Sequence, residues 1–239
     1  MSILAVAGGA VAAAAGTMVY AVRGRSSRLL APSLHRGPKN RRAIALTFDD
    51  GPTPATARLL EILAQHGARA TFFVCGLNVE RYPQIARATV LSGHELGNHG
   101  YSHARLWLRS AEFIYQELAS AQRAIAAVAG QPPRWFRPPY GVRWFGLRQA
   151  QRRLGLTGVM WTALARDWKL PAEAIVRRLA RAAANGAIFC LHDGRELDPR
   201  AHIAATLEAV ERLLPLLRER GFELVTVSEL LGPQPASRA

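Results

Sequence analysis

The sequence predicts an α/β fold in which parallel strands alternate with helices. From residue 43 onward, short apolar runs alternate with longer helical patterns, as in strands joined by right-handed helical crossovers. Polar residues follow five of the predicted strands, at the face where barrels of this class build active sites. An open doubly wound sheet would draw its site mainly from a few strands, so we expect a seven-stranded (β/α) barrel.

The predicted elements follow one another along the chain and are separated by residues that begin or end helices. Pro54 and Pro171 suit the first turns of helices, and glycines just past the ends of five predicted helices suit left-handed caps. The predicted strands are 43–48, 70–75, 94–98, 134–137, 156–161, 187–191 and 222–225. The predicted helices are 54–66, 81–92, 110–129, 144–154, 171–184 and 202–220.

The amino-terminal segment differs in composition from the rest of the chain. Residues 3–22 carry no charge, and twenty apolar residues are just enough to span a bilayer. We therefore predict that residues 1–22 form an apolar helix and a single membrane anchor. A cleaved signal peptide and a helix packed on the domain are the alternatives. The arginines that follow favour a cytoplasmic position for the rest of the chain.

Three further regions complete the predicted organisation. Residues 23–42 contain Ser, Pro, Gly and seven basic residues and are predicted to form a linker. Residues 43–231 form one domain, and residues 232–239 form a flexible tail. Cys75 and Cys190 each lie in an apolar run, so we expect two buried free thiols.

The chain is strongly basic, with 31 Lys and Arg against 17 Asp and Glu and a formal net charge of +14. Such a surface favours anionic partners, such as phospholipid, anionic glycan or nucleic acid. The arginines are scattered along the chain instead of forming one run, and the sequence contains no signature of a nucleic-acid-binding module. We therefore expect no nucleic-acid partner.

Two adjacent carboxylates, Asp49 and Asp50, follow the first predicted strand. In isolation an Asp-Gly-Pro sequence is typical of an ordinary turn. Two ionised carboxylates in contact repel each other, and a cation beside one and an arginine beside the other would relieve that repulsion. Alternation along the strand end would point them in different directions, so that one could bind a metal while the other faced a reacting water.

Two histidines, His99 and His103, follow the third predicted strand and are four residues apart. On a helical turn this spacing places both rings on one face. One carboxylate and two imidazoles form the ligand set of a catalytic zinc site with an open position. The same ligands also accept other divalent cations, including Co²⁺, Ni²⁺ and Mn²⁺. A divalent metal, with Zn²⁺ preferred, is therefore the predicted cofactor.

Further polar residues follow later strands. Arg137 precedes two prolines, which restrict the backbone, and it could bind a carboxylate in a forked pair. His192 ends an apolar run and is suited to donating a proton near neutral pH. Asp167 could orient its ring. Taken alone, Arg137 and His192 are also compatible with an ordinary loop or turn.

Together, these motifs resemble the polysaccharide deacetylase family, also called the NodB-homology or carbohydrate esterase 4 group. The resemblance runs from about Ile44 to Leu230 and implies the distorted seven-stranded barrel of that family. It is carried by five motifs, at 47–52, 99–103, 137–140, 167–168 and 190–192.

The resemblance implies roles for the first three motifs. Asp50, His99 and His103 would bind a divalent metal, usually zinc. Asp49 would be the general base, and Arg137 would orient it.

The resemblance also implies roles for the later motifs. His192 would be the general acid, with Asp167 behind it. The backbone N–H of Tyr140 would stabilise the oxyanion, and Trp168 and Leu191 would form an apolar wall near the acetyl methyl group.

These features lead us to expect a metal-dependent hydrolase that removes an N-acyl group, in the simplest case N-acetyl, from an amino sugar in a polysaccharide, peptidoglycan or related glycan. One alternative is a deacylase or deformylase of a lipid-linked amino sugar at the membrane. Another is a non-catalytic glycan-binding module, which would not need both a base and an acid. The family commonly works outside the cytoplasm, against the charge rule, so the side of the membrane stays open.

Overall fold

The computed structural model describes residues 3–232, which contain one nine-stranded sheet. All its strand pairs are parallel, and the spatial order is β1-β6-β5-β4-β3-β2-β8-β7, with β9 beside β2. The strands are β1 (Ser33–Leu34), β2 (Ala43–Asp49), β3 (Thr71–Val74), β4 (Glu95–Asn98), β5 (Trp135–Phe136), β6 (Thr157–Val159), β7 (Ala163–Leu164), β8 (Ala187–His192) and β9 (Glu223–Val225).

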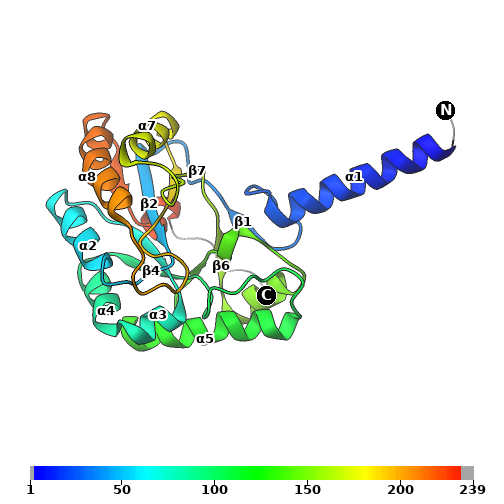
Figure 1. The fold of residues 1–239 in the computed structure, drawn as a ribbon, viewed down its shortest axis with the longest axis horizontal. Coiled ribbons are helices and arrows are strands. Elements are labelled where there is room, and N and C mark those ends of the chain that lie inside the picture. The colour runs from blue at the N-terminus through cyan, green and yellow to red at the C-terminus, as the bar shows by residue number, and fades with distance from the viewer. Residues whose placement is uncertain (1–2, 233–239) are drawn as a thin grey trace.

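Helices pack around this sheet, and the amino-terminal helix extends away from it (Figure 1). They are α1 (Ile3–Arg23), α2 (Thr56–Gln65), α3 (Gly76–Arg81), α4 (Pro83–Leu91), α5 (Ala111–Ala129), α6 (Leu147–Leu154), α7 (Ala172–Ala182), α8 (Ala204–Glu219) and α9 (Val227–Leu231). A short 3₁₀ turn spans Pro139–Gly141.

The predicted α/β class and parallel pairing are confirmed, but the ring of strands is not closed. Within residues 3–232 the two end strands, β1 and β7, do not pair with each other, so the sheet forms a half-barrel. Each end strand is only two residues long and offers few backbone groups for a closing ladder. β1, β7, α3 and α9 were not predicted, because such short elements carry too little periodicity to recognise.

Strand β2 lies at the centre of the sheet and positions the site. All seven of its residues are buried, as expected for a parallel strand covered on both faces. It pairs with β3 and β9 on one side and with β8 on the other. The register with β8 sets Thr47 opposite Cys190 and Asp49 opposite His192. The last residues of both strands therefore reach the same rim.

The main hydrophobic core lies between the sheet and helices α2, α7 and α8. Each helix buries apolar residues at a spacing of three or four, which forms one apolar face. On α8 these include Val210, Leu213, Leu214 and Leu217.

The structure does not support the membrane anchor that we predicted at the amino terminus. Among the helices of residues 3–232, none has the length and apolar character needed to cross a membrane. The predicted single membrane anchor, and the membrane-associated localisation inferred from it, were therefore wrong. The segment is dominated by alanine and glycine, which carry little apolar surface per residue.

The predictions for the linker, the carboxyl-terminal tail and the two cysteines compare with the structure as follows. Residues 33–34, within the predicted linker, form β1 and pair with β6. Of the predicted tail at 232–239, residues 233–239 lie outside the described residues. Cys75 and Cys190 are both free and buried, as predicted.

Helix α8 offers a matched test of the core. Replacing the fully buried Leu213 by Ala removes packed methyl groups and leaves a cavity, so we expect a loss of about 2–5 kcal/mol in the free energy of unfolding. Leu216 on the same helix is 36% exposed, and Leu216→Ala should cost less than about 1 kcal/mol. Urea denaturation followed by circular dichroism measures both, and equal losses would contradict this assignment of the core.

Candidate active site

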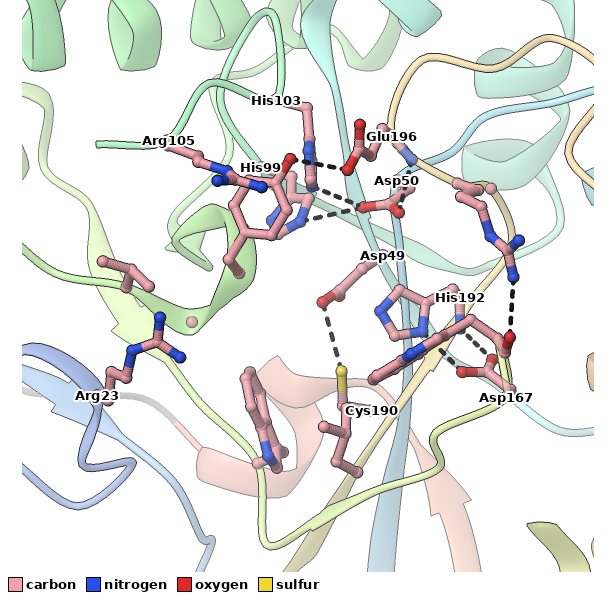
Figure 2. Close-up of a pocket in the computed structure, with 18 of the residues that line it drawn as sticks. Arg23, Asp49, Asp50, His99, His103, Arg105, Asp167, Cys190, His192 and Glu196 are labelled. Atoms are coloured by element: carbon pink, nitrogen blue, oxygen red, sulfur yellow. Dashed lines mark hydrogen bonds and ion pairs between the residues drawn. The ribbon is translucent and has the colours of Figure 1, made fainter. Parts of the chain in front are cut away.

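The carboxyl ends of the strands open into one cavity of about 950 Å³. Most of the polar residues predicted from the sequence line it, although they come from distant parts of the chain (Figure 2). They are Asp49, Asp50, His99, His103, Asp167 and His192, together with Tyr140 and Trp168. Arg137 is fully buried behind them.

Asp50, His99 and His103 converge in the buried part of the cavity. The Nε2 atoms of His99 and His103 lie 3.3 Å and 3.0 Å from Asp50 Oδ1. One potential ligand atom from each of the three residues lies within 4.8 Å of the others. The spacing of the two histidines and the turn after β2 therefore bring together the three predicted ligands.

The chemistry of these atoms fits a cation. The carbonyl oxygen of Arg137 lies 2.7 Å from His99 Nδ1 and can only accept, so Nδ1 carries the proton and Nε2 of the neutral ring presents a lone pair. That lone pair faces a carboxylate oxygen, and two acceptors in contact repel unless a cation lies between them. Asp50 Oδ1 is buried and has no hydrogen bond of normal geometry within the described residues.

Electrostatics keep Asp50 ready to bind a cation. Burial raises the pKa of its carboxyl, but His103 and His99 outweigh burial when their Nε2 atoms carry a proton, and the pKa then falls well below its usual value. A cation in the place of those protons would act on the carboxylate in the same direction. Its second oxygen accepts the backbone N–H of Glu196 at 2.9 Å. The ionised carboxylate is thereby oriented with Oδ1 toward the two imidazoles.

The loop that carries the histidines is held by side chains of its neighbours. Asn98 accepts the backbone N–H of Gly100 at 2.8 Å, and Glu117 of α5 accepts those of Tyr101 and Ser102 at 3.2 Å and 3.0 Å. Gly100 has a φ of +80°, a conformation that glycine adopts without strain. The glycine after the first histidine therefore suits the turn.

Arg137 connects several parts of the site. Its Nη1 donates to Asp49 Oδ1 and to Thr47 Oγ1, each at 2.7 Å, and its Nε donates to the carbonyl of Val159 at 3.0 Å. Its guanidinium also lies over the ring of Phe73, 4.2 Å from the centroid. These partners hold the buried guanidinium in place. The guanidinium in turn orients the Asp49 carboxylate.

Asp167 holds His192 on the neighbouring strand β8. Asp167 Oδ1 lies 2.8 Å from His192 Nδ1, and Oδ2 accepts the backbone N–H of His192 at 2.8 Å and the hydroxyl of Thr206 at 2.9 Å. Burial lowers the pKa of His192, but Asp167 and the charges of Asp50 and Asp49 outweigh it and raise the pKa to about 9. The ring is therefore protonated at neutral pH and can donate a proton.

The residues predicted to contact substrate have mixed outcomes. Tyr140 lies on the 3₁₀ turn with its ring against His103, at a centroid distance of 4.7 Å. Trp168 packs edge-on against His192 at 5.1 Å and is 40% exposed. The prediction that Leu191 lines the acyl pocket was wrong. Side chains alternate along β8, so Leu191 points into the main core and its neighbour Cys190 lines the cavity instead.

Sequence reasoning missed Asp193, which supports the turn after β2. Asp193 Oδ1 accepts the backbone N–H of Gly51 at 3.1 Å, and Oδ2 accepts the hydroxyl of Thr56 at 2.7 Å. Burial raises the pKa of this carboxyl to about 7, against the hydrogen bond from Thr56. Its place between His192 and Gly194 was visible in the sequence, but its partners were not.

One wall of the cavity was also missed from the sequence. This wall is formed at the end of α1 by Met18, Val19, Val22 and Arg23. Figure 2 shows Arg23 across the cavity from His192. Arg143 holds this end of the helix, because its backbone N–H donates to the carbonyl of Val22 at 3.0 Å. No local pattern signals this contact, because it joins segments more than a hundred residues apart.

The chain is similar to one known protein family and to several named proteins. The model of the family described as polysaccharide deacetylase matches residues 36–159. A chitooligosaccharide deacetylase of Azorhizobium caulinodans is 37% identical, over 78% of this chain and 93% of that protein. A peptidoglycan-N-acetylglucosamine deacetylase of Listeria monocytogenes is 32% identical over 86% of this chain, which spans only 42% of that longer protein.

A solved structure adds a contrast. A pseudoenzyme of carbohydrate esterase family 4 from Bacillus anthracis has a TM-score of 0.76 and 30% identity, over 85% of this chain and 69% of that one. Likeness of fold therefore does not by itself show activity, which must be argued from the residues of the site.

The ion pair between Asp167 and His192 makes a prediction about pH. The pKa of His192 is raised in the folded protein, so the stabilisation is complete below the unfolded pKa of about 6.5 and is lost as the pH rises through about 9. In Asp167→Asn the charge is removed while burial remains, so we expect the pKa to fall by more than about one unit. NMR titration of the metal-free protein measures it.

Asp198→Asn is the matched control for this titration. Asp198 is exposed, and among the described residues its carboxylate accepts only from the backbone N–H of Arg200. The His192 resonance should titrate in this variant as in the unchanged protein. An unaltered pKa in Asp167→Asn would contradict the role given to that carboxylate.

Proposed function

The chain belongs to the polysaccharide deacetylase family, and we propose that it hydrolyses the N-acetyl group of N-acetylglucosamine units in a glycan. One observation carries this proposal. A carboxylate held by Arg137 and an imidazole held by Asp167 flank a cluster of three metal-ligating groups in a single cavity. A glycan-binding module would have no need of a positioned base and acid in addition to such a cluster.

Asp50, His99 and His103 would hold the metal, and their buried lone pairs support a divalent cation such as Zn²⁺. Such a cation supplies Lewis acidity toward the amide carbonyl and the attacking water. The ligand set accepts several metals, with Co²⁺, Ni²⁺ and Mn²⁺ as alternatives.

The residues around the cluster would carry the proton transfers. Asp49 takes a proton from the attacking water, and Arg137 keeps its carboxylate in place. His192 then donates its proton to the amide nitrogen, so that the sugar leaves as a neutral amine instead of an unstable anion. Asp167 stabilises the charged imidazolium before that step.

The oxyanion and the acyl group would meet residues on two walls. The backbone N–H of Tyr140 would donate to the developing oxyanion. Trp168 and Cys190 would surround the acetyl methyl group, since both line the cavity beside His192. Residues 43–231 would form the catalytic domain.

Relatives of this chain are named for chitooligosaccharide and for peptidoglycan N-acetylglucosamine, which supports an N-acetylated glycan as the substrate. A lipid-linked amino sugar is the second candidate. Met18, Val19 and Val22 make one wall of the cavity apolar, and Arg23 adds a positive charge beside them. An apolar chain bearing a phosphate would suit that wall better than a purely polar glycan does.

Release of acetate distinguishes these candidates. We expect the chain to release acetate from N-acetylglucosamine oligomers or peptidoglycan, and a chelator to abolish that release. The same assay with a lipid-linked N-acetylated or N-formylated amino sugar, read by mass spectrometry, tests the second candidate. Absence of acyl release from all of them, with metal bound, would favour a binding module.

Substitutions of the two adjacent aspartates should have different effects, one on metal binding and the other on the rate of reaction. Asp50→Asn removes a ligand charge, so bound metal measured by elemental analysis should fall by about tenfold or more. Asp49→Asn should keep the metal but lower kcat by about 10²–10⁴-fold, the range for loss of a general base. Thermal denaturation controls for folding, because Arg137 loses its charged partner in the second variant. Normal activity in Asp49→Asn would refute its role.

A further inference from the structure

A second group of metal-binding side chains lies beside the first. Asp49, Cys190 and His192 each offer a ligand atom, and these atoms lie within 4.8 Å of one another. Cys190 Sγ is 3.4 Å from Asp49 Oδ2. Figure 2 shows these side chains around one part of the cavity, apart from the group formed by Asp50 and the two histidines.

The strand register produces this group. Cys190 and His192 are two residues apart on β8, so both point to the cavity face while Leu191 points into the core. Asp49 is paired with His192 across the parallel ladder and lies on the same face. The group therefore sits on two central strands, and no loop has to move to assemble it.

Asp49 and His192 are each held by a charged partner through one atom, and the other potential ligand atom of each faces the group. Arg137 binds Asp49 Oδ1, which leaves Oδ2 toward Cys190. Asp167 binds His192 Nδ1, and Nε2 makes no hydrogen bond with the residues that the structure describes. Metal-binding histidines in proteins are commonly oriented by a carboxylate on the other ring nitrogen in this way.

We propose that Asp49, Cys190 and His192 form a second cation site, selective for thiophilic ions such as Zn²⁺ and Cd²⁺. Carboxylate, thiolate and imidazole are the three ligand types that Zn²⁺ takes in proteins, whereas Mg²⁺ and Mn²⁺ prefer oxygen ligands. Binding forms a metal–sulfur bond and releases the thiol proton to solvent, together with the imidazolium proton, so no oxidant or reductant is needed.

The second ion binds more weakly than the first. The Cys190 thiol is buried and must lose its proton before the sulfur can bind an ion. An ion already held by Asp50 also repels a second cation nearby. The second site therefore fills only when the ion is in excess.

Occupation of this site inhibits the enzyme, a consequence that rests on the proposed function. The ion binds the carboxylate oxygen of Asp49 that would accept a proton from water. It also binds the His192 nitrogen that would carry the proton for the leaving amine. Zinc thus activates the chain at the first site and inhibits it at the second.

Metal stoichiometry tests the site without any assay of activity. The full chain is freed of metal, dialysed against excess Cd²⁺, and analysed for ions per chain and for thiolate-to-metal absorption in the ultraviolet. We expect two ions and the absorption band for the unchanged chain. Cys190→Ala should bind one ion without the band, with second-site affinity lowered by about tenfold or more.

Two matched variants serve as controls for the assignment to Cys190. Cys75→Ala removes the other buried thiol and should keep both ions and the band. Asp50→Asn should keep the band, because it weakens only the first site. One ion with no band in the unchanged chain, or a band that disappears in Cys75→Ala and not in Cys190→Ala, would overturn the proposal.

A zinc titration of acetate release then separates this inference from the proposed function. The unchanged chain should rise to full activity and fall again in excess zinc. The activity of Cys190→Ala, taken relative to the maximum of that variant, should not fall in excess zinc. Activity without inhibition at excess zinc would overturn the second site and leave the deacetylase proposal intact. Two bound ions without acetate release would overturn the deacetylase proposal and leave the second site intact.

Discussion

The site depends on one buried side chain, Arg137. Its guanidinium holds the carboxylate of Asp49, and its own carbonyl sets which nitrogen of His99 carries the proton. One residue therefore fixes the geometry of the predicted base and of a predicted metal ligand. A buried guanidinium is stable only when its donors are paired, so the alignment of β2, β5 and β6 that supplies those partners is tied to the chemistry.

Parallel pairing explains why six polar side chains from distant segments meet. All strand pairs of the sheet run the same way, so their carboxyl ends share one rim, and β2 and β8 end in register at Asp49 and His192. The end of α1 supplies an apolar wall to the cavity at that rim. The cavity consequently combines a fixed polar floor with a wall built from a separate segment.

Cys190 links the proposed reaction and its proposed control by zinc. The residue lies on the cavity face of β8, next to the carboxylate and the imidazole that would transfer protons. An apolar residue in that position could only shape the acyl pocket, whereas a thiol also adds a third ligand type. The same strand alternation that places His192 for catalysis thereby creates a place for a competing ion.

The sequence by itself determined the α/β class, the seven main strands and the polar residues at their ends, because hydrophobic periodicity and motif spacing are local properties. Only the tertiary structure decided that the barrel is half open, that Leu191 faces the core, and that α1 lines the cavity. The predicted membrane anchor was wrong, because residues 3–22 have sufficient length but consist largely of alanine and glycine, which carry little apolar surface. The closure of the barrel, the face to which Leu191 points and the packing of α1 against the cavity depend on contacts between residues far apart in the chain. Local patterns do not encode which distant groups will meet.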